Sequence, residues 1–367
     1  QRDRIGFDDV LLAEEGRPYW GVTDDYDVFL GQRGFAGRQF EHGMSNNEYL
    51  TRTWHLPEDC HVTNWATREM ARMIRRRDPE RPGFWYLSYS HPHPPLVPLT
   101  TYWDMYSGRD PDWPVCGEWS ADPHELPYRL QLQHDGWHCR KPSEIQRALQ
   151  AFYALCTHID HQLRVVLGTL REEGILDDTI VLFTSDHGDM LGRHGLWAKR
   201  LFYEYAANVP LLLMGTKDDR RIQPGTSDDR LVGWQDVMPT LLGLAGLPIP
   251  ESVVGRSMVT DPEREFLYGE CLEDLMATRM IRQGRYKLIY YAAGNHVQLY
   301  DVQDDPDELQ DLSMHPGVSG IREQLTQRLM GELYGSDLEW IRDGALIGLD
   351  HPPHQPQPNR DLSIQRG

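Results

Sequence analysis

Short apolar runs and amphipathic stripes alternate along the first 250 residues of the chain. Apolar, strand-like runs lie at residues 84–89, 180–183 and 209–215. Apolar positions spaced three and four apart predict helices over residues 62–77 and 143–173. Strands that alternate with helices are typical of an α/β protein whose sheet is doubly wound, mostly parallel and flanked by helices. The apolar runs are short and uninterrupted, which predicts strands buried on both faces.

The pattern changes after residue 250. Short β-rich runs separated by glycine-containing turns predict a small antiparallel sheet, and residues 317–335 predict a helix that packs on it. The β-rich runs are 266–268, 278–282, 286–291 and 297–300. We therefore expect an α/β catalytic domain over residues 1–250, an α+β subdomain over 251–345 and an extended tail over 346–367.

Details of the central region extend this picture. Ser143, with Gln146 three residues later, has the spacing of a capping box at the start of the long helix. Cys156 falls within the apolar stripe of that helix, which predicts a core position, and Gly174 is predicted to end the helix. Residues 96–142 are rich in Pro, Trp and Asp and lack periodicity, which is typical of a lid or a binding loop.

Metal-competent side chains follow the predicted strand 180–183. Asp186 and His187 come just after it, at the strand end where open α/β sheets place their ligands. Neighbouring side chains in an extended chain point to opposite faces, so these two can share one ion only if the chain bends, and Gly188 permits that bend. Ser185 beside them does not indicate a Ser-His-Asp triad, because triad members come from separate parts of a chain.

A second group of candidate side chains follows the predicted strand 84–89. His91 and His93 alternate with prolines, and residues two apart in an extended chain share a face on which both can ligate a metal. Taken alone, a proline-stiffened loop with structural histidines is the favoured alternative. Lys199, further along the chain, is a further candidate. A divalent metal with carboxylate and imidazole ligands polarises an anionic ester, while a lysine and a histidine neutralise charge and protonate a leaving group.

Composition narrows the function classes. The net charge of −19 argues against nucleic acid and anionic membranes as partners, and no apolar run approaches the roughly 18 residues of a membrane helix. Of 37 basic residues only four are lysines, which draws attention to a lysine near an anion site. Five scattered cysteines without a CxxC spacing favour a reducing compartment. A cytoplasmic location is therefore favoured over a periplasmic one, although the chain begins with Gln and its leader is not visible.

Four segments together resemble a known family. Residues 183–204, which begin Phe-Thr-Ser-Asp-His-Gly-Asp-Met-Leu-Gly, are similar to the central motif of the sulfatase family of the alkaline phosphatase superfamily. Its branches include arylsulfatases, choline sulfatases and phosphonate monoester hydrolases. Residues 88–95 resemble the strand-end histidine motif of that family, residues 236–241 the helix after its core, and residues 285–291 its C-terminal subdomain.

The resemblance implies roles for the candidate residues. It makes Asp186 and His187 two of the metal ligands, with Ca²⁺ favoured over Mn²⁺ or Mg²⁺. It makes His93 and Lys199 the groups that hold sulfate or phosphonate oxygens, one of them assisting the leaving group. Arg193 stands where relatives often carry an acidic residue, and we expect it to face solvent.

The nucleophile of the family does not occur in this chain. That nucleophile is a formylglycine made from a Cys/Ser-x-Pro/Ala-x-Arg motif, and the nearest approach begins at Cys139, with proline and arginine misplaced. Residues 4–8 resemble the segment that follows the missing part in relatives. We therefore expect roughly a hundred further residues, carrying the formylglycine and the remaining metal ligands, to precede this chain. Residues 1–367 alone are predicted to be inactive.

Three functions remain open at this point. The first is hydrolysis of small-molecule sulfate esters by the intact protein. The second is hydrolysis of phosphonate monoesters or phosphodiesters, because both substrates present a tetrahedral anionic centre. The third is an inactive fragment or pseudoenzyme that binds anions or assembles with another chain, and a homo-oligomer is compatible with all three.

Overall fold

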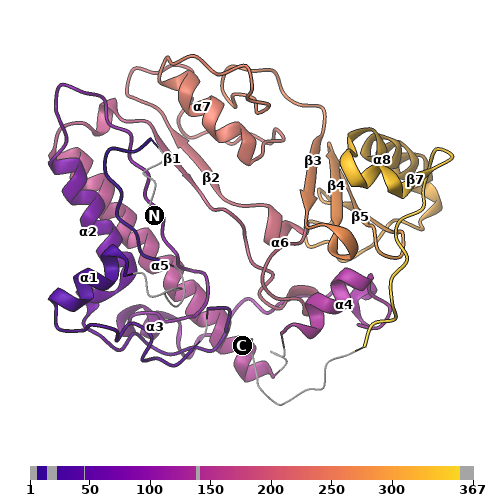
Figure 1. Ribbon diagram of the computed structural model, residues 1–367, viewed down its shortest axis with the longest axis horizontal. Coiled ribbons are helices and arrows are strands. Elements are labelled where there is room, and N and C mark those ends of the chain that lie inside the picture. Colours follow the sequence, from indigo (N-terminus) through magenta and orange to yellow (C-terminus); the bar gives the residue numbers. More distant parts are fainter. Residues whose placement is uncertain (1–5, 15–22, 45, 138–140, 356–367) are drawn as a thin grey trace. The chain divides into compact units, whose positions relative to one another are not determined.

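The computed structural model describes residues 6–14, 23–44, 46–137 and 141–355 of the chain (Figure 1). The chain divides into two compact units. The first comprises Gln1–Trp113, Trp137–Asp177 and Asn359–Gly367, and the second comprises Pro114–Gly136 and Asp178–Pro358. Each unit is described by itself below. Cys139, the start of the nearest approach to a nucleophile motif, lies outside the described residues.

Four α-helices lie in the described part of the first unit, among loops and extended segments. Its helices are α1 (Asp25–Gln32), α2 (Val62–Arg75), α3 (Thr100–Tyr106) and α5 (Pro142–Glu172). α2 and α3 both pack along the long helix α5 (Figure 1). The apolar spacing of residues 62–77 and 143–173 predicted two of these helices, and both predictions are confirmed.

Two expectations about α5 are wrong. The helix begins at Pro142 with Lys141 as its N-cap, so Ser143 lies inside the first turn and makes no capping hydrogen bond. Proline suits the first helical position because its missing N–H has no partner there in any case. Cys156 is exposed and not in the core. Gly174 follows the C-cap with φ +71°, as a helix-ending glycine does.

Residues 84–89 are extended, but they do not form the predicted strand. No ladder joins them to another described segment. Trp85 and Leu87 pack against a cluster that includes Met70, whereas Phe84 and Tyr86 are 66% and 65% exposed. Successive side chains of an extended chain alternate between two faces, and here only one face is covered. The prediction of burial on both faces is therefore wrong.

The second unit contains a two-stranded sheet of β1 (Val181–Thr184) and β2 (Leu211–Met214), which confirms both predicted strand positions. The pair is antiparallel, with Val181 opposite Met214. This differs from the expected parallel order. A parallel pair needs a crossover connection, usually a helix, and only the single turn of α6 (Glu204–Ala207) is α-helical between these strands. The burial expected of β2 is also absent, because three of its four residues are exposed.

The C-terminal sheet is antiparallel, as the sequence predicts. Its order is β3-β4-β5-β6, from β3 (Leu267–Cys271), β4 (Thr278–Gln283), β5 (Tyr286–Tyr291) and β6 (His296–Asp301). Helix α8 (Ser319–Glu332) packs on β4 and β5. The unit also contains α4 (Tyr128–Asp135), α7 (Val237–Leu244) and a small hairpin of β7 (Ile341–Arg342) and β8 (Ala345–Leu346).

Both faces of this sheet are buried. Leu288 and Tyr290 of β5 face the cluster that includes Leu325 and Leu329 of α8. Ile289 and Tyr291 belong to a second cluster, together with Leu126, Leu130, Met190, Leu196, Leu201 and Tyr203. The period-two alternation of a strand explains this division. The second cluster matters most, because it packs the segment that follows β1 onto the sheet.

Among the residues that the structure describes, no helix is both long and apolar enough to cross a bilayer.

Candidate functional site

Asp186 and His187 come together just after β1. Asp186 Oδ2 lies 3.4 Å from His187 Nε2, and Asp186 Oδ1 accepts the backbone N–H of His187 at 3.0 Å. The Asp186 side chain is 76% exposed and that of His187 is 29% exposed. The predicted bend therefore exists, and it directs both side chains toward one accessible point.

The hydrogen bonds of His187 fix its tautomer. Its Nδ1 lies 2.7 Å from the carbonyl oxygen of Gly188, which can only accept, so Nδ1 carries the proton. Neutral imidazole then has its lone pair on Nε2, the atom nearest Asp186. A metal-binding histidine is typically oriented in this way, by a hydrogen bond from its other nitrogen. The pair suits a hard or borderline divalent cation.

The chain after Gly188 folds back on itself in a narrow loop. The Gly188 N–H donates to the Ala206 carbonyl at 2.9 Å, and the Met190 N–H donates to the Ala198 carbonyl at 2.9 Å. A Cβ at residue 188 would lie 2.0 Å from the carbonyl oxygen of Tyr205, so no side chain fits there. The turn that presents Asp186 thus rests directly on the backbone of residues 205–206.

Lys199 lies in the same loop. It follows Ala198, whose carbonyl accepts the N–H of Met190, so the fold brings the backbone of Lys199 next to the segment that follows the Asp186–His187 pair. The Gln133 side chain donates to the carbonyls of Trp197 at 2.6 Å and Lys199 at 3.3 Å. Lys199 itself is half-buried. These contacts hold its backbone in place, and its role toward a substrate oxygen stays a prediction.

Arg193 does not face solvent, and that expectation is wrong. It is 7% exposed, and its guanidinium lies 3.8 Å from the centre of the Tyr205 ring. Such a cation–π contact stabilises a buried arginine. The next residue, His194, accepts the backbone N–H of Gly117 at Nδ1, and burial lowers its pKa to about 4. Both side chains are therefore buried parts of the loop's own packing.

His93 belongs to the first unit. Its backbone N–H donates to the Ser90 carbonyl at 3.1 Å, and its Nδ1 donates to the Pro94 carbonyl at 2.7 Å. The lone pair of a neutral His93 is therefore on Nε2, as in His187. The other three candidates, Asp186, His187 and Lys199, belong to the second unit, so joint action of His93 with them stays a prediction.

His91 is part of a histidine cluster. Its ring packs against His61 with 4.9 Å between ring centres, and its Nδ1 lies 3.3 Å from the Thr63 hydroxyl. His61 in turn contacts His158 at 4.8 Å. This placement supports a structural role for His91 and not shared metal binding with His93. Among the residues that the structure describes, no group of three or more His, Cys, Asp or Glu side chains is arranged to hold a metal ion.

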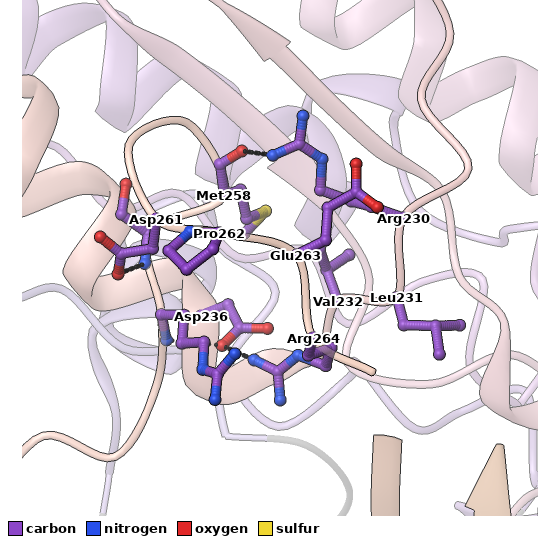
Figure 2. Close-up of a pocket in the computed structure, with 11 residues that line it drawn as sticks. Arg230, Leu231, Val232, Asp236, Met258, Asp261, Pro262, Glu263 and Arg264 are labelled. Carbon is purple, nitrogen blue, oxygen red and sulfur yellow. Dashed lines mark hydrogen bonds and ion pairs between the residues drawn. The ribbon is translucent and has the colours of Figure 1, made fainter. Parts of the chain in front are cut away.

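A small cavity near α7 is not a substrate site. Asp236 is 1% exposed, accepts the backbone N–H groups of Gly233 and Arg256, both at 2.8 Å, and pairs with Arg264 (Figure 2). The cavity beside it, which Arg230 also lines, has a volume of about 10 Å³. That is room for about one water molecule. Asp236 therefore ties the segment around residue 256 to the start of α7.

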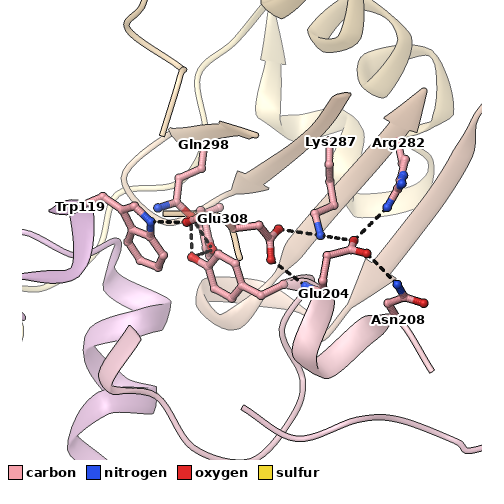
Figure 3. Close-up of polar contacts among 9 residues, drawn as sticks. Trp119, Glu204, Asn208, Arg282, Lys287, Gln298 and Glu308 are labelled. Carbon is pink, nitrogen blue, oxygen red and sulfur yellow. Dashed lines mark hydrogen bonds and ion pairs between the residues drawn. The ribbon is translucent and has the colours of Figure 1, made fainter. Parts of the chain in front are cut away.

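Sequence reasoning missed a buried cluster of charged side chains. Lys287 of β5 lies between the carboxylates of Glu204 and Glu308, and its side chain is 2% exposed (Figure 3). The sequence does indicate this position: residues 287, 289 and 291 share one face of a strand, so the pattern that buries Ile289 and Tyr291 also directs Lys287 to that buried face. A lysine at such a position needs an acidic partner.

The chain is similar to known proteins over most of its length. The family model for Sulfatase matches residues 20–247, and a model described as N-sulphoglucosamine sulphohydrolase, C-terminal, matches residues 192–333. An arylsulfatase of Clostridium perfringens is 31% identical over 96% of this chain and 76% of its own length. A choline-sulfatase of Rhizobium meliloti is 31% identical over 81% of this chain and 63% of its own length.

A solved structure shares the fold of this chain. The phosphonate monoester hydrolase of Agrobacterium radiobacter superposes with a TM-score of 0.71 at 22% identity, covering 83% of this chain and 68% of that one. The fold is thus the α/β fold of the alkaline phosphatase superfamily, which confirms the expected class. Within it, the family model and the two curated relatives assign the chain to the sulfatase family. The chain spans 76% and 63% of the length of the two curated relatives named above.

Proposed function

We propose that the protein containing this chain hydrolyses sulfate esters with the help of a divalent metal ion. The observation that carries the proposal is the Asp186–His187 pair, with a carboxylate oxygen 3.4 Å from an imidazole nitrogen that carries a lone pair. The pair stands after β1 in a chain of the sulfatase family. The high exposure of Asp186 leaves the point between the two side chains accessible to a ligand.

Four residues of this chain would have separate roles in the reaction. Asp186 and His187 Nε2 would hold the ion, which when bound polarises the ester oxygens. Lys199 is assigned to neutralise charge on the non-bridging oxygens. His93, whose Nδ1–H is held by the Pro94 carbonyl, is assigned to act in its doubly protonated form: it delivers its Nε2 proton to the departing oxygen and becomes the neutral imidazole. The formylglycine motif does not occur in residues 1–367.

One observation favours a second candidate function. The structure superposes on a phosphonate monoester hydrolase with a TM-score of 0.71. Sulfate and phosphonate esters both present a tetrahedral anionic centre. The Asp186–His187 pair, Lys199 and His93 would therefore serve either substrate. Sulfate is favoured here because the two curated relatives reported above are an arylsulfatase and a choline-sulfatase.

Matched substrates distinguish the two functions. The full-length protein that contains residues 1–367 is assayed with an aryl sulfate and with the phenylphosphonate ester of the same phenol, so that the leaving group is constant. We expect kcat/KM to be higher for the sulfate by at least about tenfold, which corresponds to about 1.4 kcal/mol of transition-state binding. A preference of that size for the phosphonate would overturn the sulfatase proposal.

A further inference from the structure

The buried charge cluster connects the C-terminal sheet to the segment after β1. Lys287 Nζ lies 2.7 Å from Glu204 Oε1 and 2.6 Å from Glu308 Oε1 (Figure 3). The side chains of Lys287 and Glu308 are 2% and 0% exposed. A lysine with so little contact with water is retained only where its partners hold it closely.

Glu308 binds both the lysine and the backbone of Glu204. Its Oε2 accepts the N–H of Glu204 at 2.7 Å, at the first residue of α6. Arg282 Nη1 and Asn208 Nδ2 each donate to Glu204 at 2.9 Å (Figure 3). Glu204 is therefore held at its backbone N–H and at both carboxylate oxygens. Its partners are Lys287, Arg282 and Glu308, which are distant in sequence, and Asn208, which directly follows α6.

The electrostatics of the two carboxylates depend on Lys287. Burial alone would raise the pKa of Glu204, but the Lys287 ammonium, with Arg282, outweighs burial and lowers that pKa. Burial raises the pKa of Glu308, and Lys287 opposes this only in part. Without the ammonium, two carboxylates would face each other in a site with little water, and like charges at such a distance repel.

Glu204 is close in sequence to the residues that contact the Asp186–His187 turn. The next two residues, Tyr205 and Ala206, form the surface on which Gly188 rests, since the Gly188 N–H donates to the Ala206 carbonyl. The carbonyl of Tyr205 occupies the space that a Cβ at residue 188 would need. Any displacement of residues 205–206 therefore displaces Gly188, which follows His187 directly.

We propose that Lys287 is a positioning residue for the Asp186–His187 pair. With Glu308 it fixes Glu204, and Glu204 fixes the backbone on which the Asp186–His187 turn is hydrogen-bonded. The inference deepens the proposed function and rests on it only for its effect on catalysis. Its structural part, that loss of Lys287 loosens the turn, can be tested without any substrate.

Hydrogen exchange of the Gly188 amide is the direct readout. Lys287→Met removes the charge and keeps a side chain of similar length. In this variant we expect the Gly188 amide of the full-length protein to exchange about tenfold faster than in wild type, the change expected when one hydrogen bond of ordinary strength is weakened. Lys287→Arg retains a cation that can bridge two carboxylates, so it should restore slow exchange.

A matched control lies on the opposite face of the same sheet. Arg279 of β4 makes a buried ion pair with Asp337 at 2.6 Å, and its guanidinium lies over the ring of Trp340. Arg279→Met removes an equally buried cation and should destabilise the protein, yet the Gly188 exchange should stay within about twofold of wild type, after correction for global unfolding. Equal exchange in the two methionine variants, or no change in either, would overturn the proposal.

A substitute variant and a kinetic measurement complete the test. If Lys287→Met does not yield folded protein, Glu308→Gln replaces it, with the same expected and overturning results. For aryl sulfate hydrolysis, Lys287→Met should lower kcat/KM about tenfold more than Arg279→Met does, matching the exchange result. If wild type hydrolyses neither sulfate nor phosphonate, the proposed function fails, while the exchange comparison still decides the role of Lys287.

Discussion

At residue 188 the chain has no room for a side chain. Gly188 lies against the carbonyl of Tyr205, and its N–H is bonded to Ala206. This close backbone contact, rather than an unusual φ, requires glycine at the position, because residue 188 is not among the positive-φ glycines. The bend between Asp186 and its neighbours is thus built into the packing.

Gly188→Ala should therefore destabilise the protein. The added methyl group must displace backbone atoms, and overpacking of this kind costs about 1–3 kcal/mol. The free energy of unfolding, measured by urea titration, checks the value. Gly331→Ala in α8 is the matched control, because a Cβ there meets nothing within 4 Å; it should be neutral or stabilising by up to about 1 kcal/mol. Equal stability of Gly188→Ala and wild type would contradict the close packing.

Residue-level prediction succeeded where neighbours in sequence decide the outcome. The bend at Asp186–His187 follows from a strand end and an adjacent glycine, both visible in the sequence. Arg193 and Cys156 were placed wrongly, because their exposure depends on distant partners. Arg193 is covered by Tyr205 across the loop, whereas the part of α5 that carries Cys156 is exposed on that side.

At the scale of elements, a histidine cluster joins α2, α5 and the loop that carries His93. His61 donates from Nε2 to the Val97 carbonyl at 3.2 Å and accepts the Thr63 N–H, so it is held neutral. Burial lowers the pKa of His61 well below its usual value, and lowers that of His158 from 6.5 to about 4. Neutral histidines are therefore part of the folded packing.

Acid should destabilise this packing. His158 has a lower pKa folded than unfolded, so it contributes fully above pH 6.5, and its contribution is lost as the pH falls from 6.5 toward 4. The expected slope is about 1.4 kcal/mol per pH unit in that window. The free energy of unfolding is measured from pH 7 down to pH 4 in wild type and in His158→Gln. Between pH 6.5 and pH 4 its slope against pH should be smaller in the variant by about 1.4 kcal/mol per pH unit. An unchanged slope in the variant would contradict the assignment.

Element positions were predictable mainly from local periodicity. The helices over residues 62–75 and 142–172 and the strands of the C-terminal sheet follow from repeats within each segment. Strand partners did not follow in the same way. The antiparallel pairing of β1 with β2 depends on the loop closed by Gly188 and Ala206, and the one-sided burial of residues 84–89 depends on which segments reach them. Such contacts are non-local, and periodicity does not encode them.

At the scale of the whole molecule, the chain is a member of the sulfatase family with two compact units. Asp186, His187 and Lys199 lie in the second unit, in one loop packed against the C-terminal sheet. Lys287 extends that site into the sheet, because it holds Glu204 and with it the base of the loop. Family membership was predictable from motifs, whereas this support required the fold.

A metal titration tests the central claim most directly. The full-length protein is depleted of divalent ions with a chelator, and aryl sulfate hydrolysis is followed as Ca²⁺, Mn²⁺ or Mg²⁺ is returned. Wild type should regain activity with at least one of these ions. Asp186→Asn should need at least about 100-fold more of that ion for half-maximal rate, because it weakens one of the two proposed ligands. Asp218→Asn, an exposed control in the same unit, should titrate as wild type does. An Asp186→Asn protein that titrates like wild type would contradict the assignment of the Asp186–His187 pair as the metal site.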